Sequence, residues 1–67
     1  MKNRLHEIIE SKGLIKSWVA DQAGINRSSL HKIESNKMVP SVRAAIKLAI
    51  VLDVDVEDIF IIEPSDW

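Results

Sequence analysis

Residues 16–35 read KSWVADQAGINRSSLHKIES, and this stretch decides the fold. Small and apolar residues recur at helical spacing on both sides of a glycine; they are Val19, Ala20 and Ala23 before it and Leu30 and Ile33 after it. Gly24 suits a tight turn because glycine takes a positive φ without steric cost, and Ala20 lets two helix axes approach closely. Asn26 supplies a second helix start. The stretch therefore predicts a helix-turn-helix.

The second helix of this motif leaves a polar stripe on its outer side. If Leu30 and Ile33 point inward, helical spacing exposes five other residues together; they are Arg27, Ser28, His31, Lys32 and Ser35. Arg27 and Lys32 can donate hydrogen bonds to guanine edges, while Ser28 and His31 can pair with bases as donors or acceptors. One interpretation is an ordinary solvated helix face. The turn upstream favours the other, in which Arg27, Ser28, His31 and Lys32 read bases in the major groove.

Length and composition set the outer limits. A chain of 67 residues is one domain, residues 1–67, and is too short for a deep catalytic cleft. Its apolar content of 46% indicates a globular chain, and no apolar run approaches the length that spans a bilayer. Cysteine is absent, which excludes disulfides and thiolate metal sites. Without a signal-peptide pattern at the start, we expect a cytoplasmic protein that does not bind membranes.

The charge is polarised along the chain. Residues 1–40 hold seven Lys or Arg against four Asp or Glu, a net +3, whereas residues 41–67 hold two against six, a net −4. Such a field turns the basic part toward phosphates and keeps the acidic part away from them. The overall charge of −1 also predicts that the sequence-independent, electrostatic part of DNA binding is weaker than in a strongly basic domain.

Start and stop signals predict an all-α domain with five helices. The helices are expected at residues 2–12, from about 15 to 24, at 27–35, at 42–52 and directly after Asp55. In the first, Leu5, Ile8 and Ile9 face inward, and Gly13 ends the helix in a left-handed conformation. Only the stretch from Phe60 to Ile62 has strand-forming composition.

The helix starts differ in how they are capped. The second helix begins without a capping side chain, so its first amides are left to water, to Ser17 or to a ligand phosphate. Asn26 caps the third helix, Ser41 the fourth and Asp55 the fifth. Ile59 and Phe60 are expected to pack inward. The residues of the fourth helix that are available for the core are Val42, Ala45, Ile46, Ala49 and Ile50.

Several short motifs resemble the Cro/C1-type helix-turn-helix family in order and spacing. They are Gly13-Leu14, Val19-Ala20, Ala23-Gly24-Ile25, Arg27-Ser28-Ser29-Leu30, Lys32-Ile33-Glu34, Asn36-Lys37 and Pro40-Ser41. The match covers about residues 3–62. The resemblance implies a compact, lambda repressor-like domain whose third helix enters the major groove, usually as a dimer on a palindromic operator.

The resemblance also implies roles for individual positions. Arg27 and Ser28 would be the first base readers and Lys32 a later one, with Ser29 and Lys37 on phosphates. Lys16 and Ser17 at the uncapped start of the second helix join this set. The residues expected to contact phosphates are therefore Lys16, Ser17, Ser29, Asn36 and Lys37.

Three positions depart from the family pattern. Ile15 and Lys16 stand where the family commonly has Thr or Ser followed by a phosphate-contacting Gln, so Lys16 would act as a point charge. In the family, an arginine in the first helix often pairs with the glutamate that corresponds to Glu34. This chain has Ile9 at the position of that arginine, so the partner of Glu34 is left open. Asn36 follows Ser35 where the family has Asn-Gly, so it replaces glycine in the left-handed conformation.

Other features point to no chemistry. His6 and His31 are isolated, and no Ser, His and acid can be grouped by spacing, so we expect no metal, no cofactor and no enzymatic activity. Trp18 lies at the edge of the core, either partly buried or against a partner. The tail, residues 61–67, is either a frayed end or a dimer contact. In the second interpretation the contact residues are Phe60, Ile61, Ile62 and Trp67.

The sequence as a whole predicts a DNA-binding transcriptional regulator, with repression of a palindromic operator by a homodimer as its activity. Two alternatives stay open. One is an antitoxin-like module that binds DNA and also holds a protein toxin through the acidic fifth helix and tail. The other is a protein-binding antagonist that keeps the fold and has lost DNA affinity, which the low net charge allows.

Overall fold

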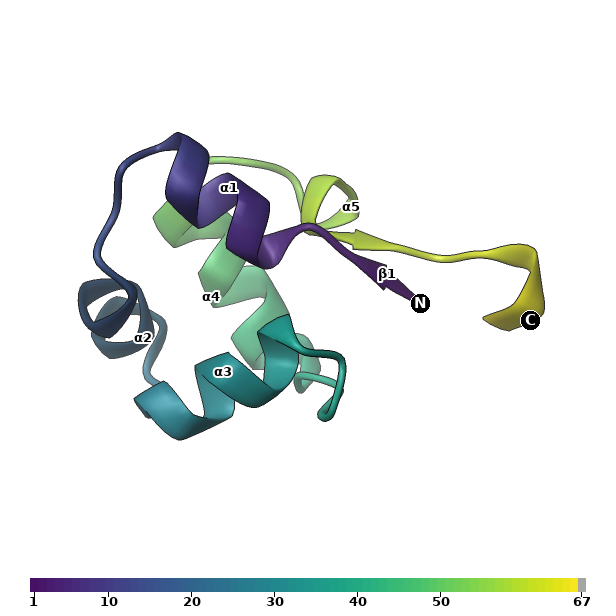
Figure 1. Cartoon of the computed structure of the whole chain (residues 1–67), viewed down its shortest axis with the longest axis horizontal. Helices are drawn as coiled ribbons and strands as arrows, with labels where there is room; N and C mark the ends of the chain where they lie inside the picture. The colour runs from purple at the N-terminus through teal and green to yellow at the C-terminus, as the bar shows by residue number, and fades with distance from the viewer. Residues whose placement is uncertain (67) are drawn as a thin grey trace.

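The computed structural model describes residues 1–66, which form five α-helices, two short strands and a final 3-10 turn (Figure 1). The elements are β1 (Lys2–Asn3), α1 (Leu5–Ser11), α2 (Lys16–Ala23), α3 (Arg27–Glu34), α4 (Val42–Leu52), α5 (Val56–Ile59), β2 (Phe60–Ile61) and the turn η1 (Pro64–Asp66). The prediction of an all-α domain with five helices is confirmed, and a small two-stranded sheet is added to it.

The first helix is shorter than predicted, because residues 2–12 divide between a strand and a helix. β1 pairs antiparallel with β2, and Asn3 lies opposite Phe60 in the register. Asn3 lies in β1 rather than inside the helix, and its Oδ1 accepts a hydrogen bond from the amide of Leu5, the first residue of α1, at 2.8 Å. Helical periodicity cannot reveal this pairing because the two strands come from opposite ends of the sequence.

α2 and α3 form the predicted helix-turn-helix. Gly24 ends α2 with φ 73° and ψ 27°, the left-handed conformation that glycine adopts at no steric cost. Asn26 Oδ1 accepts from the amide of Ser29 at 2.7 Å and so caps α3. Ile15 precedes α2 in an extended conformation and provides no side-chain cap, as predicted.

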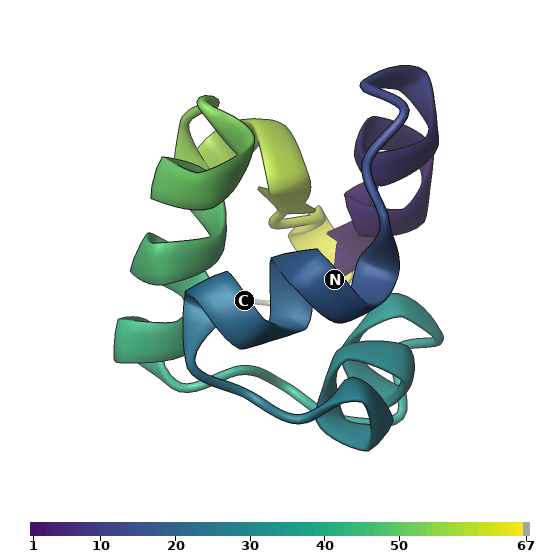
Figure 2. The same ribbon diagram turned by 90° about the vertical axis from the view of Figure 1, so that its left-hand side faces the viewer.

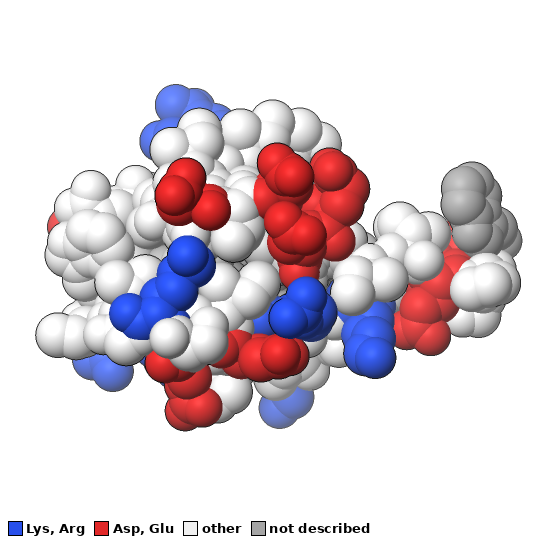
Figure 3. Space-filling model, turned by 90° about the horizontal axis from the view of Figure 1, so that it is seen from above, with Lys and Arg blue, Asp and Glu red and all other residues white. Residues whose placement is uncertain are grey.

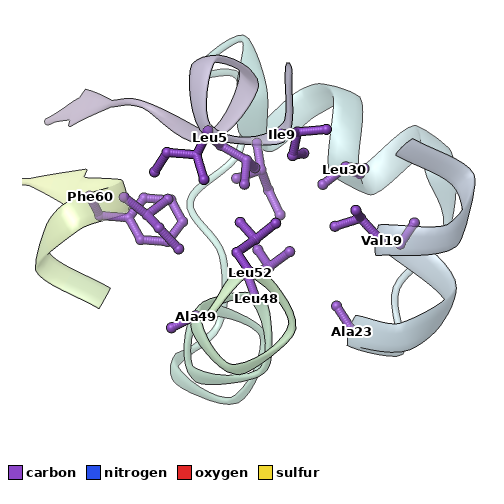
Figure 4. Close-up of a cluster of buried hydrophobic side chains, with 13 residues drawn as sticks. Leu5, Ile9, Val19, Ala23, Leu30, Leu48, Ala49, Leu52 and Phe60 are labelled. Atoms are coloured by element: carbon purple, nitrogen blue, oxygen red, sulfur yellow. The ribbon is translucent and has the colours of Figure 1, made fainter. Parts of the chain in front are cut away.

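One hydrophobic cluster between the helices holds the domain together (Figure 4). Its buried members are Leu5, Ile8, Ile9, Val19, Ala20, Ala23, Leu30, Ile33, Leu48, Ala49, Leu52, Ile59 and Phe60. Burial of each large side chain contributes roughly 1.5–3 kcal/mol. The inward-facing residues predicted for the first three helices, and for Ile59 and Phe60, are confirmed.

The buried face of α4 differs from the prediction. Ala49 is buried and Ala45 half-buried as expected, but Val42, Ile46 and Ile50 keep 77%, 48% and 72% of their surface exposed. The other buried residues of the helix are Ala44, Leu48 and Leu52. Arg43 and Lys47 mark the exposed side of α4, but Val42, Ile46 and Ile50 stand on that side too, so an apolar residue alone does not identify the buried face. The positions of α2 and α5 against it determine which face is buried.

The turn from α4 to α5 depends on acidic residues. Asp53 ends α4 with φ 56°, a left-handed conformation that the sequence analysis did not predict. α5 begins directly after Asp55, as predicted, and the amide of Asp55 donates to Asp58 Oδ2 at 3.0 Å. In residues 1–66, no helix is both long and apolar enough to cross a bilayer.

Candidate nucleic-acid interface

α3 presents one side to the core and the other to solvent. Leu30 and Ile33 anchor it, at 1% and 0% exposure. The residues predicted to read bases lie away from the core and are all exposed; they are Arg27, Ser28, His31 and Lys32. α3 lies at the lower edge of the molecule in both Figure 1 and Figure 2. A long ligand can therefore approach this helix without meeting another helix first.

The four exposed side chains of α3 are available for hydrogen bonding. Within residues 1–66, none of them makes a side-chain hydrogen bond or an ion pair. Ser35 differs, because its hydroxyl donates to the backbone oxygen of His31 at 2.9 Å. The donors of Arg27 and Lys32 match the acceptors that guanine presents in the major groove, where a helix of this width fits.

The residues predicted to contact phosphates lie at the start of α2, in the first turn of α3 and just after α3. Ser17 is exposed in the first turn of α2, and Asn36 and Lys37 are exposed just after α3. Asn36 has φ 60°, so its predicted left-handed conformation is confirmed. Ser29 is half-buried in the first turn of α3. Phosphate contacts at two separate points would fix the orientation of α3 on a duplex.

Lys16 occupies a position that the sequence analysis did not predict. Its Nζ lies 3.1 Å from Glu34 Oε2, which supplies the partner of Glu34 that the family pattern left open. The Glu34 side chain is only 6% exposed, and its Oε1 is buried without a hydrogen-bond partner in residues 1–66. Lys16 remains 41% exposed. Because an ammonium has three donors, a contact with Glu34 leaves two for a phosphate.

His6 extends this cluster onto α1. Its Nδ1 lies 3.9 Å from Glu34 Oε2, and its Nε2 lies 3.2 Å from Glu10 Oε1. Three helices, α1, α2 and α3, therefore meet around the Glu34 carboxylate. The signal that could have found His6 is its spacing of four residues from Glu10, which places both on one face of α1.

Comparison with known proteins identifies this arrangement. A helix-turn-helix family model matches residues 5–59. The chain belongs to the Cro/C1-type helix-turn-helix family. The predicted resemblance is confirmed, and the family is one of DNA-binding transcriptional regulators.

Three relatives illustrate this membership. An uncharacterised HTH-type transcriptional regulator of Methanocaldococcus jannaschii is 35% identical over 66 residues, covering 98% of this chain and 100% of the relative. One from Archaeoglobus fulgidus is 30% identical over 66 residues, covering 98% and 94%. One from Bacillus subtilis is 29% identical over 66 residues, covering 98% and 100%. Each is similar to this Cro/C1-type chain over nearly its whole length.

Four acidic residues of this Cro/C1-type domain gather away from α3. Asp53, Asp55, Glu57 and Asp58 lie in and around the turn between α4 and α5. Figure 3, seen from above the view of Figure 1, shows acidic side chains in a dense group on the face opposite the lower edge. α5 is at the top in Figure 1 and α3 at the bottom. Lys and Arg side chains lie on the same face, so the acidic group is local to the turn between α4 and α5 (Figure 3).

The four residues predicted to contact a second copy differ in their accessibility. Phe60 is 8% exposed and belongs to the core of the single chain, so the structure does not offer its side chain to a partner. Ile61 is half-buried in β2, and Ile62 is 57% exposed. Trp67 lies outside the described residues. The chain beyond β2 extends away from the helices (Figure 1).

Trp18, which the sequence places at the edge of the core, is exposed over 46% of its surface. Together with Gly13, Leu14 and Ile15 it lines a shallow hollow of about 260 Å³. This hollow is mostly apolar and lies beside the start of α2.

Proposed function

We propose that this chain represses transcription by binding a palindromic operator as a homodimer, with α3 of each copy in the major groove. The observation that carries the proposal is the outer face of α3. Arg27, Ser28, His31 and Lys32 are exposed there, and their side chains form no hydrogen bond or ion pair within residues 1–66, on a helix that Leu30 and Ile33 hold against the core. A rigid helix presents base-reading groups with little further loss of conformational entropy.

Phosphate contacts set the position of the helix in the groove. In this proposal Ser17 and Lys16 at the start of α2, and Asn36 and Lys37 after α3, bind the DNA backbone; their exposure supports that role for Ser17, Asn36 and Lys37, and Lys16 is 41% exposed. These contacts supply affinity for any sequence and fix the register, whereas α3 supplies specificity. The acidic turn between α4 and α5 lies on the other side, which favours one orientation on DNA.

Binding as a dimer doubles the recognition surface. One short helix reads only a few base pairs, so two helices about 34 Å apart, one turn of B-DNA, are needed for a long operator. The homodimer also makes the operator an inverted repeat, because the protein axis imposes its symmetry on the site. An occupied operator that overlaps a promoter represses by excluding the polymerase.

Selection from a pool of random duplexes tests the proposal. The expected result is an enriched inverted repeat whose half-site centres are about 10 base pairs apart. Enrichment of a single half-site would contradict the homodimer. A pool that stays random would contradict specific binding, and would favour the alternative of a protein-binding antagonist. A reporter placed behind the selected site then distinguishes repression from activation.

A further inference from the structure

Two carboxylates and two basic side chains meet where α1, α2 and α3 come together. Figure 2 shows the start of α2 with α1 above it and α3 below it. Glu34 Oε2, on α3, lies 3.1 Å from Lys16 Nζ and 3.9 Å from His6 Nδ1. The other ring nitrogen of His6, Nε2, lies 3.2 Å from Glu10 Oε1. The charged groups that face His6 are therefore Glu10 on its own helix, Glu34 on α3 and, through the shared oxygen, Lys16 on α2.

The position of His6 between two carboxylates suits a protonated ring. A neutral imidazole has one N–H, so it turns a proton toward one carboxylate and a lone pair toward the other. An imidazolium turns an N–H toward both. Histidine is also the side chain whose charge ordinarily changes between about pH 5 and pH 8. The contacts of His6 with Glu10 and Glu34 are therefore both attractive only after the ring gains a proton.

The charge of His6 affects how firmly Glu34 holds Lys16. The Glu34 side chain is 6% exposed and its Oε1 is buried without a hydrogen-bond partner in residues 1–66, so the carboxylate depends on the groups beside Oε2. When His6 is neutral, Lys16 is the only cation at that oxygen. When His6 is protonated, a second cation shares the oxygen, and the two cations repel each other. The ammonium of Lys16, which is 41% exposed, is then held less firmly.

We propose that His6 is a positioning residue, which controls through its charge how available Lys16 is to a DNA phosphate. This inference rests on the phosphate contact proposed above for Lys16 and adds its regulation. Neutral His6 leaves the ammonium of Lys16 committed to Glu34. Protonated His6 takes over part of the charge of Glu34, so Lys16 binds the phosphate. Duplex affinity therefore rises as the pH falls, and it does so for every base sequence because the contact is with the backbone.

Duplex binding at about pH 6 and about pH 8, at one salt concentration, tests this inference. The chain has two histidines, so His31→Gln serves as the background in which His6 is the only one. A scrambled duplex should bind about threefold more tightly at the lower pH. The additional change His6→Gln should remove this difference, and so should Lys16→Met. His6→Arg, which is charged at both pH values, should bind at the higher pH as the parent background binds at the lower one. A difference that persists in His6→Gln would overturn the proposal.

Urea unfolding without DNA tests the same inference independently of the proposed function. The coupling between Lys16 and Glu34 is measured at both pH values from Lys16→Met, Glu34→Gln and the double variant. Written as an equilibrium constant, this coupling should be about threefold smaller at the lower pH, and independent of pH when His6→Gln is added. A coupling that does not change with pH while His6 is present would overturn the proposal. A coupling that falls at low pH in a chain that binds no duplex would support the action of His6 on Lys16 while refuting the proposed DNA binding.

Discussion

Lys16 Nζ lies 3.1 Å from Glu34 Oε2, so one ion pair joins the first residue of α2 to the last residue of α3. These two positions begin and end the helix-turn-helix. The pair therefore constrains the angle between the two helices at the point farthest from the turn at Gly24. The Glu34 carboxylate is buried and Lys16 is half exposed. The positive charge of Lys16 therefore offsets the cost of burying the negative charge of Glu34.

Removal of the lysine should destabilise the domain. Lys16→Met leaves the buried Glu34 carboxylate without its nearest cation, and an unsatisfied buried acceptor costs about 1–3 kcal/mol. The double variant Lys16→Met, Glu34→Leu should recover part of this loss, because no buried charge remains. Urea unfolding at neutral pH measures both. Lys12→Met, at an exposed lysine without an ion pair in residues 1–66, is the control. Equal stability of the two single lysine variants would contradict the assigned role.

A side chain at the turn should also destabilise the domain. Gly24 has φ 73°, where a residue with a Cβ is strained by roughly 1–2 kcal/mol. A Cβ there would meet only the mobile Lys47 Nζ, at 3.4 Å, so strain rather than crowding is the cause. Gly24→Val should lower the melting temperature by about 4–8 °C per kcal/mol. Gly24→Asn should lose less, since asparagine tolerates this conformation. An unchanged melting temperature for Gly24→Val would show that the turn adapts.

Acid should weaken a contact at the start of α1. The Arg4 guanidinium donates to Glu7 at 3.2 Å, and this hydrogen bond and charge lower the pKa of Glu7 below its ordinary 4.5. A lowered pKa means that the contact stabilises the fold above pH 4.5 and that its contribution is lost as the pH falls further. Arg4→Met should therefore lose less stability than the parent chain on acidification through this range. Thermal unfolding from pH 6 to about pH 3 measures it; parallel curves would exclude the contact.

The helix-turn-helix and its caps were predictable because their causes are local. Gly24, Asn26 and the inward spacing of Leu30 and Ile33 lie within one short stretch, and each acts on its immediate neighbours. Family membership followed from the same residues. The exposed face of α3 was predictable for this reason too, since a helix with one buried side must expose the other.

The remaining features depend on contacts between distant segments. β1 replaces the start of the first helix because β2 pairs with it, and the sequence around Lys2 gives no sign of that partner. The prediction for the buried face of α4 was wrong because Val42, Ile46 and Ile50 are apolar residues on its exposed side, and the helices packed against α4 cover the other side. Lys16 and Glu34 meet through the tertiary fold, although both were singled out separately.

We expect α3 to read the base sequence and the residues beside it to supply affinity for any duplex. Arg27→Ala should weaken binding to the selected operator by roughly 1–3 kcal/mol and relax preference at one base position. Lys37→Ala should weaken binding to all duplexes about equally and lower the salt slope by about one.

The most direct measurement is the ratio of operator to scrambled-duplex affinity, determined at several salt concentrations for the parent chain and for both variants. The predicted result is a ratio that falls about fivefold or more in Arg27→Ala and stays within about twofold of the parent in Lys37→Ala. An equal fall in both variants, or an unchanged ratio in Arg27→Ala, would contradict the account.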